Sequence, residues 1–256
     1  MTDRNTTGLS AIDYRITDDL ADPPGMTESF YSEKLLRLPA PFLCYQPPEV
    51  APDVVEPPVL RNGCITFGSF NKAAKTGPET IALWAAVLRA LPTSKLIMKS
   101  RGLASEGSRR RIIDAFASNG VNEDRLRLIE AEQPLAAHLA MYGKIDIALD
   151  TFPYHGTTTT CEAMWMGVPV ITRAGQTHVS RVGVSLLSSV GLSDLVTDAD
   201  EQFVAKAVSL AWKGQELTDL RAGLRGRMQS STLCDQSGFT RRFERALRAA
   251  WKSKVL

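Results

Sequence analysis

Thiols and metal-binding residues are scarce in this sequence. Its 256 residues include four cysteines and three histidines. The cysteines, Cys44, Cys64, Cys161 and Cys234, are far apart in the sequence and form no CxxC pair. Such spacing does not suit a structural zinc site, so we expect free thiols in a reducing compartment. We also expect a functional site that requires no metal ion and no cofactor.

Long apolar runs are missing as well. No stretch approaches the roughly 20 consecutive apolar residues that span a bilayer. Residues 1–19 are polar and acidic and lack the apolar core of a signal peptide. We therefore expect a cytoplasmic protein that does not bind a membrane.

The signatures of several common functions are also absent. The sequence contains no GxSxG, HExxH or Walker P-loop motif, which argues against the enzyme classes that carry them. No GxGxxG follows a strand, so an unrelated Rossmann-type oxidoreductase is rejected as an alternative. No basic face with interleaved aromatic residues stands out, and nucleic acid is therefore not an expected partner.

The net charge of +2 is unevenly distributed along the chain. Residues 1–60 contain four Lys/Arg and ten Asp/Glu, which leaves a surplus of +8 on the remainder. A basic surplus suits a phosphorylated ligand, but solvated helix faces explain it equally well. The charge by itself leaves both interpretations open.

Proline is concentrated near the N-terminus, where nine of the fourteen prolines precede residue 60. Because proline lacks a backbone N–H and fixes φ, this stretch cannot form a long helix or an inner strand. We predict that residues 1–60 are irregular apart from one short helix over residues 28–36. Residues 47–58 resemble an inter-domain linker.

From Cys64 onward, apolar runs of strand length alternate with stretches of helical period. Ile81, Trp84 and Leu88, for example, recur at three- and four-residue spacing, which is typical of one helix face. Strands are predicted at residues 65–70, 95–98, 125–130, 145–149, 168–172 and 195–196. Helices are predicted at residues 78–91, 107–118, 135–142, 158–166, 181–190, 201–212 and 217–229. This alternation predicts an α/β fold with a Rossmann-like parallel sheet over residues 61–233.

The C-terminal residues 234–256 are predicted to form a separate amphipathic helix. Phe239, Phe243 and Trp251 fall on one face of it, and arginine and lysine occupy most of the rest. The apolar stripe requires a packing partner that the sequence does not identify.

The strand-to-helix loop at residues 150–162 carries the clearest chemical signal. Ligands of open parallel sheets bind at the carboxyl ends of the strands, where such loops lie. Gly156 gives the backbone freedom, and four threonines then lead into a helix whose free N–H groups and positive dipole end attract a diphosphate. Those threonines are Thr157, Thr158, Thr159 and Thr160. Glu162, one turn further, can accept hydrogen bonds from ribose; alternatively, one threonine merely caps the helix and Glu162 favours its dipole.

The loop after the first strand supplies cations. It contains Asn71, Lys72 and Lys75, and either lysine can neutralise phosphate as a flexible point charge. Simple solvation of both lysines is the alternative, because most loop lysines are exposed. Residues 130–133, after the third strand, give a weaker signal for backbone contacts to a base.

The three histidines are His138, His155 and His178. His155 lies inside the threonine loop, which makes it a candidate for ligand binding or acid–base chemistry. A packing or surface role is the alternative for each of them.

Residues 146–169, DIALDTFPYHGTTTTCEAMWMGVP, closely resemble the catalytic region of protein O-GlcNAc transferases and the related Spindly-type O-fucosyltransferases. These enzymes form glycosyltransferase family 41. Residues 12–25, 65–72 and 178–187 resemble the same family, so the resemblance extends over nearly the whole chain. Bacterial members look most similar.

The resemblance implies a GT-B fold of two domains, of which this chain is the C-terminal, donor-binding half. Residues 1–60 are then the end of the N-terminal catalytic lobe and a linker, and tetratricopeptide repeats usually precede that lobe. The implied reaction transfers a sugar, with GlcNAc as the first candidate, from a nucleotide diphosphate sugar to a protein Ser or Thr hydroxyl, with inversion.

The resemblance also implies roles for individual residues. Lys75 matches the lysine that contacts the leaving diphosphate and is the catalytic candidate. Thr158 and Thr159 match the threonines that bind the same diphosphate, and Glu162 matches the residue that binds ribose. The remaining donor-binding candidates are Asn71, Lys72, Gln133, His138, His155, Gly156, Thr157 and Thr160.

Base recognition follows the family less closely. Gln133 falls in the segment that contacts uracil through its backbone, and His138 matches a histidine just beyond it. Leu135 stands where the animal enzymes have a lysine packed on the base, which leaves UDP and GDP sugars both open. Thr157 replaces a histidine of the animal enzymes.

Two classes of function are therefore carried forward. The first is an enzyme domain whose partners are a nucleotide sugar and a protein acceptor. The second is a truncated nucleotide-sugar-binding fragment without independent activity. The intact donor motifs favour the first, which is the preferred interpretation. The short length favours the second, since the sequence lacks the tetratricopeptide repeats and most of the acceptor-side lobe that the family implies.

Overall fold

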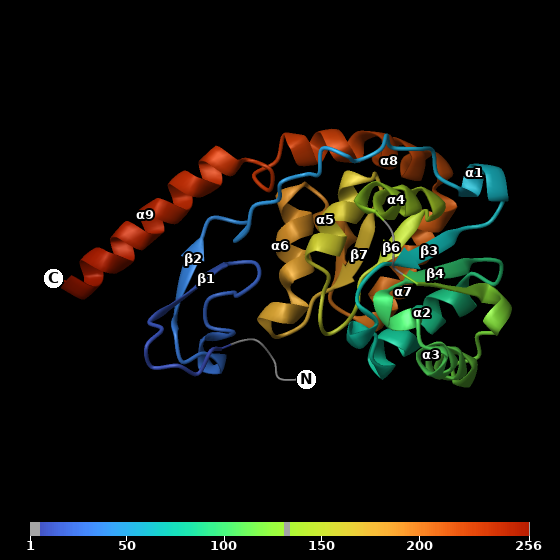
Figure 1. Ribbon diagram of the computed structural model, residues 1–256, viewed down its shortest axis with the longest axis horizontal. Helices are drawn as coiled ribbons and strands as arrows, with labels where there is room; N and C mark the ends of the chain where they lie inside the picture. The colour runs from blue at the N-terminus through green and yellow to red at the C-terminus, as the bar shows by residue number, and fades with distance from the viewer. Residues whose placement is uncertain (1–5, 131–133, 256) are drawn as a thin grey trace.

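The computed structural model describes residues 6–130 and 134–255. Its main feature is a parallel six-stranded sheet in the order β5-β4-β3-β6-β7-β8 (Figure 1). The strands are β3 (Thr66–Ser69), β4 (Lys95–Lys99), β5 (Leu126–Ile129), β6 (Ile147–Leu149), β7 (Val170–Arg173) and β8 (Val196–Thr197). Each predicted strand overlaps one of these, and the predicted α/β class is confirmed.

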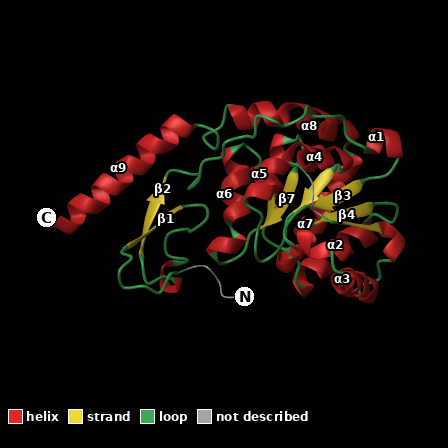
Figure 2. Ribbon diagram, viewed as in Figure 1, coloured by secondary structure: helices red, strands yellow, loops and turns green. Residues whose placement is uncertain are grey.

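Helices alternate with the strands along the chain. They are α1 (Val59–Asn62), α2 (Pro78–Ala90), α3 (Glu106–Ser118), α4 (Leu135–Ala140), α5 (Thr158–Trp165), α6 (Val182–Ser189), α7 (Asp200–Trp212), α8 (Gly214–Gln229) and α9 (Gln236–Val255). Helices α2 and α3 lie on one side of the sheet, and α4 and α5 on the other (Figures 1 and 2). Helix α7 packs on α2, and α8 packs on α5. No helix in the described ranges is long and apolar enough to cross a bilayer.

Helix α2 shows why the local pattern was readable from sequence. Pro78 occupies its first turn, where the missing N–H removes no helical hydrogen bond. The predicted face is buried, with Trp84 fully enclosed and Ile81 5% exposed. The Trp84 indole N–H also donates to the carbonyl oxygen of Asp150 at 3.1 Å, which ties α2 to the end of β6.

The strand order determines where a ligand site can form. From β3 the chain moves outward through β4 and β5, then returns to β6 on the other side of β3 and continues to β7 and β8. The connections that follow β3 and β6 therefore diverge. A crevice forms at the carboxyl ends of strands at such a reversal, and both predicted ligand loops begin there.

The prediction for residues 1–60 was wrong in part. Two strands, β1 (Tyr14–Asp18) and β2 (Lys34–Leu38), pair in parallel, and only the 3-10 helix η1 (Glu28–Phe30) lies within the predicted helix at residues 28–36. The prolines of residues 1–60 all lie outside β1 and β2, so they did not prevent these strands from forming. Strand β2 is stabilised by pairing with β1 and by contact with α9, which lies at the other end of the sequence.

Helix α9 confirms the predicted C-terminal helix and shows what it contacts. It lies beside β1 and β2, away from the six-stranded sheet (Figure 1). The Tyr14 hydroxyl donates to the carbonyl oxygen of Ala250 at 3.4 Å. The apolar stripe is covered only in part, because Leu247 is 44% and Trp251 67% exposed.

Candidate functional site

A cavity of about 610 Å³ opens at the carboxyl edge of the sheet, between the loops that follow β3 and β6. It is lined by Phe70, Asn71, Lys72, Ala74, Lys75, His138, Tyr154, Thr157, Thr158, Thr159 and Glu162. The structure thus brings together the two loops that the sequence singled out. The volume is within the range of ordinary small-molecule sites.

The threonine turn leaves the amide groups of the first turn of α5 available. Thr157 is the N-cap residue of α5, but its side chain makes no capping hydrogen bond. In the described part of the chain, the first amide of this turn to donate to the backbone is that of Cys161, to the carbonyl oxygen of Thr157. Thr158 is exposed, whereas Thr160 is buried beneath the turn. The capping interpretation is therefore not supported. Within residues 6–130 and 134–255, the amides of Thr158, Thr159 and Thr160 have no hydrogen-bond acceptor, and they lie at the positive end of the helix dipole.

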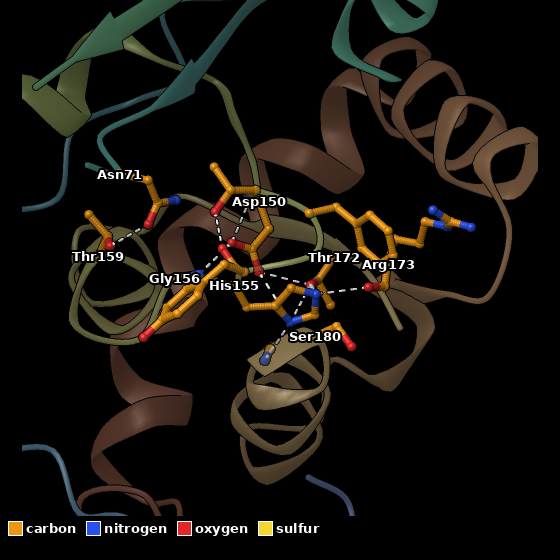
Figure 3. A network of polar contacts seen from close by, with 12 residues as sticks. Asn71, Asp150, His155, Gly156, Thr159, Thr172, Arg173 and Ser180 are labelled. Atoms are coloured by element: carbon orange, nitrogen blue, oxygen red, sulfur yellow. Dashed lines mark hydrogen bonds and ion pairs between the residues drawn. The ribbon is translucent and has the colours of Figure 1, made fainter. Parts of the chain in front are cut away.

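Asn71 fixes the position of this turn. Its Oδ1 accepts a hydrogen bond from Thr159 Oγ1 at 2.9 Å (Figure 3), and its Nδ2 donates to Ser69 Oγ at 3.3 Å. A side chain at Gly156 would place Cβ 2.6 Å from Thr160 Oγ1 and 2.9 Å from Asn71 Oδ1. Glycine is thus required there by close packing, and Gly156 shapes the cavity floor without lining it.

Lys75 faces the threonine turn from the opposite loop. It ends the 3-10 helix η2 and donates from Nζ to the carbonyl oxygen of His155 at 2.6 Å. The same Nζ lies 4.0 Å from the centroid of the Tyr154 ring. Burial lowers the pKa of Lys75 to about 8; the Asp150 carboxylate opposes that shift, and the Lys72 ammonium adds to it. A cation held here is well placed for an anionic ligand.

Glu162 forms a second polar group on the cavity wall. His138 Nε2 lies 3.0 Å from Glu162 Oε2, and the Tyr142 hydroxyl donates to the same oxygen at 3.3 Å. Burial, together with the neighbouring Glu162, raises the pKa of Tyr142 well above its usual range. Both contacts use Oε2, and among the described residues no hydrogen bond to Glu162 Oε1 is found.

The predicted ligand role of the His155 imidazole is not supported by its position. The ring is buried, and its Nδ1 accepts a hydrogen bond from the Gly183 amide at 3.0 Å. Its Nε2 must then carry the proton and donate to the Arg173 carbonyl oxygen at 2.8 Å (Figure 3). Burial lowers the pKa of His155, which agrees with a neutral ring. Both nitrogens are used inside the protein, so only the backbone of His155 faces the site.

The buried Asp150 carboxylate holds the loop after β6 through hydrogen bonds. Its Oδ1 accepts hydrogen bonds from the amides of Thr151 at 2.9 Å and Gly156 at 2.7 Å, and its Oδ2 accepts one from Thr172 Oγ1 at 2.8 Å (Figure 3). Sequence analysis did not identify Asp150 as a functional residue. The sequence did contain one signal for a role of Asp150, because its carboxylate directly follows a buried strand.

Of the remaining predicted residues, one lines the cavity and one lies outside the described part of the chain, and one unpredicted residue also lines the cavity. Lys72 lines the cavity and is exposed. Gln133 lies outside the described residues. Tyr154 lines the cavity but was not predicted; its place in the loop before the threonines was the only signal for it.

The sequence pattern of glycosyl transferase family 41 matches residues 58–243. The chain belongs to this family. The resemblance inferred from the threonine loop is thereby confirmed.

Curated relatives are similar over almost all of this chain. A probable UDP-N-acetylglucosamine--peptide N-acetylglucosaminyltransferase SPINDLY from Oryza sativa subsp. japonica is 46% identical over 97% of the chain. A protein from Arabidopsis thaliana with the same description except the name SEC is 29% identical over 96% of the chain. The chain spans 27% of the length of the rice relative and 26% of the other.

Solved structures show the same arrangement. A mutant O-GlcNAc transferase from Thermobaculum terrenum superposes with a TM-score of 0.90 and 38% identity, over 97% of this chain and 47% of that one. Sucrose-phosphate synthase from Thermosynechococcus elongatus has a TM-score of 0.60 at 14% identity, over 93% of this chain and 58% of that one, which supports the fold alone. The predicted GT-B fold class is confirmed.

Proposed function

We propose that the cavity binds the nucleotide diphosphate of a sugar donor and that this region supports transfer of the sugar to a protein Ser or Thr hydroxyl. The first-turn amides of α5 and the Lys75 ammonium border the same cavity, and this observation carries the proposal. Backbone donors at a helix N-terminus and a facing cation are a recurrent setting for diphosphate. The family membership and the named activities of the relatives point to the same ligand class.

In the proposed reaction, the acceptor oxygen forms a bond to the anomeric carbon while the bond from that carbon to the diphosphate breaks, and the acceptor hydroxyl releases its proton to solvent. The acceptor attacks from the face opposite the diphosphate, which inverts the anomeric centre. Negative charge then grows on the departing diphosphate. Lys75, Thr158 and Thr159 stabilise that charge without a metal ion, which is electrostatic catalysis by groups fixed in advance.

The other lining residues fit the nucleoside. Glu162 Oε1 accepts hydrogen bonds from the ribose hydroxyls, while His138 and Tyr142 hold the carboxylate through Oε2. Asn71, Gly156 and Thr160 fix the turn, and Thr157 lines the cavity beside it. GlcNAc is the first candidate sugar because it is named in the descriptions of the relatives.

The proposal is tested by calorimetric titration of UDP and GDP into the wild-type chain and into Lys75→Ala. Loss of a charge-assisted contact costs about 1.5–3 kcal/mol, so affinity should fall roughly 10- to 100-fold. Lys95→Ala, at the exposed start of β4, is the matched control and should bind as the wild type does. Equal affinity of Lys75→Ala and the wild type would falsify the diphosphate role.

A second candidate is nucleotide-sugar binding without independent transfer. The chain spans 27% of the length of the rice relative and 47% of the bacterial structure, so transfer by this chain is tested separately from nucleotide binding. Incubation with an acceptor peptide and either UDP-GlcNAc or GDP-fucose separates the two candidates. Product formation establishes transfer, whereas binding with no product favours the second.

A further inference from the structure

Tyr154 contacts the proposed catalytic lysine but has no role in the function proposed above. The residue lies between the cis peptide of Phe152–Pro153 and the threonine turn, and it lines the donor cavity. Its ring centroid is 4.0 Å from Lys75 Nζ. An ammonium at this distance from an aromatic face is attracted by the negative face of the ring.

The backbone that carries the ring is hydrogen-bonded on both sides of Tyr154. Thr151 Oγ1 donates to the carbonyl oxygen of Tyr154 at 2.5 Å. The next amide, that of His155, donates to the carbonyl oxygen of Val179 at 2.9 Å. The loop that carries Tyr154 is therefore bonded to its own start and to the segment after β7, which fixes the point from which the ring reaches the lysine.

Some of the surroundings of Lys75 favour its charged ammonium form, and others oppose it. The His155 carbonyl oxygen accepts its hydrogen bond at 2.6 Å, and the Asp150 carboxylate raises its pKa. Burial and the nearby Lys72 ammonium act in the opposite direction. The Tyr154 ring adds an attraction that is much stronger for the ammonium than for the neutral amine, because a full positive charge interacts more strongly with the negative face of the ring.

We propose that Tyr154 is a positioning residue, whose ring holds the Lys75 ammonium at the wall of the cavity that receives the diphosphate. The inference rests on the proposed function for its consequence in catalysis, although the contact itself is independent of it. Without the ring, Lys75 loses one of the groups that define its direction. Its amine also becomes easier to deprotonate.

The matched variants are Tyr154→Phe, which retains the ring, and Tyr154→Leu, which removes it. In the free protein, the pKa of Lys75 is measured by NMR of the labelled lysine ammonium and assigned with Lys75→Arg. Tyr154→Phe should leave this pKa unchanged, and Tyr154→Leu should lower it by roughly 0.5 to 1 unit. Tyr154→Trp, which supplies the strongest aromatic face, should raise it.

Function is measured on the same variants. At about pH 8, near the pKa of Lys75, Tyr154→Leu should bind UDP or GDP roughly 2- to 5-fold more weakly than Tyr154→Phe, because a smaller fraction of Lys75 is charged. Where transfer is detected, the alkaline limb of kcat against pH should move to lower pH in Tyr154→Leu. A purely structural role would lower activity without moving that limb.

Two outcomes overturn the inference: an unchanged Lys75 pKa in Tyr154→Leu, or an equal shift in Tyr154→Phe and Tyr154→Leu. If Tyr154→Leu does not fold, Tyr154→Trp decides, and an unchanged pKa there counts against the proposal. Failure of the wild-type chain to bind UDP and GDP would instead contradict the proposed function. The NMR result would still decide whether the ring holds the lysine.

Discussion

At the residue scale, Gly183 shows how tightly the loop is packed from below. A Cβ at Gly183 would lie 2.6 Å from Thr172 Oγ1 and 2.9 Å from both Asp150 Oδ2 and His155 Nδ1. All three neighbours are buried, so none can turn into solvent. The absence of a side chain at this position is what allows the Gly183 amide to reach the imidazole.

Gly183→Ala should therefore destabilise the protein. Overpacking of a filled core costs about 1–3 kcal/mol, and the free energy of unfolding in urea should fall by that amount. Gly223→Ala, inside α8 with nothing within 4 Å of the new Cβ, is the control and should stabilise slightly or leave stability unchanged. Equal stability of Gly183→Ala and the wild type would contradict the close packing.

The pKa of Lys75 predicts how ligand affinity depends on pH. Burial lowers that pKa to about 8, so the fraction of charged ammonium falls as the pH rises through 8. UDP and GDP are already fully ionised there, since their last phosphate ionisation lies near 6. Affinity should thus decrease between about pH 7 and 9, and Lys75→Arg should remove most of that decrease because arginine stays charged. Calorimetry across this pH range provides the measurement.

At the element scale, a buried arginine of α8 donates hydrogen bonds to carbonyl oxygens near the start of β6 and before α1. Arg221 is 1% exposed. Its guanidinium donates to the carbonyl oxygens of Val55 at 2.6 Å, Ile145 at 2.9 Å and Tyr142 at 3.2 Å. One side chain thus joins α8, the segment before α1 and the start of β6, and no helical periodicity could have indicated these partners.

Replacing Arg221 with methionine should be strongly destabilising. It leaves three carbonyl oxygens without this donor, and each unsatisfied buried group costs about 1–3 kcal/mol. We expect a loss of roughly 2–5 kcal/mol in urea unfolding, since some of these oxygens can find other partners. Arg227→Met, on the exposed side of the same helix, should change stability by less than about 0.5 kcal/mol. Similar losses in both variants would show that the buried donors are unimportant.

At the scale of the whole molecule, a buried carboxylate joins the N-terminal strands to the six-stranded unit. Asp22 lies after β1, and its Oδ2 is 2.7 Å from Nδ1 of His178, which lies after β7. Thr17 and Tyr31 also donate to this carboxylate. Burial by itself raises the pKa of Asp22, but the hydrogen bonds, led by that of His178, hold it well below its usual range.

Asp22→Asn should consequently reveal an acid-dependent contribution to stability. A carboxylate whose pKa is depressed in the folded state stabilises fully above the unfolded-state pKa of about 3.9, and this stabilisation is lost as the pH falls below it. The variant should be less stable than the wild type by roughly 1.5–3 kcal/mol near pH 7, and the difference should shrink at lower pH. The measurement is urea unfolding of the variant and the wild type near pH 7 and again below the unfolded-state pKa of about 3.9. Asp194→Asn, on the surface, should show neither effect.

The sequence predicted the elements of the six-stranded unit better than those of the first 60 residues. Strands and helices after Cys64 are set by local periodicity, and each predicted element overlaps one in the structure. Strands β1 and β2 escaped prediction because their stability comes from pairing with each other and from α9, more than 200 residues away in sequence from Tyr14.

For the site, residue types along the chain pointed to the threonine turn, to Glu162 and to the lysines of the loop after the first strand, and the family resemblance singled out Lys75. The structure places these residues around one cavity. Residue types alone left alternatives open, because threonines also cap helices and most loop lysines are solvated. The direction of each side chain was decided only by tertiary packing. His155 turns inward to Gly183, and Tyr154, its neighbour, turns toward Lys75. Adjacent residues share a loop, but the surrounding elements determine what each of them contacts.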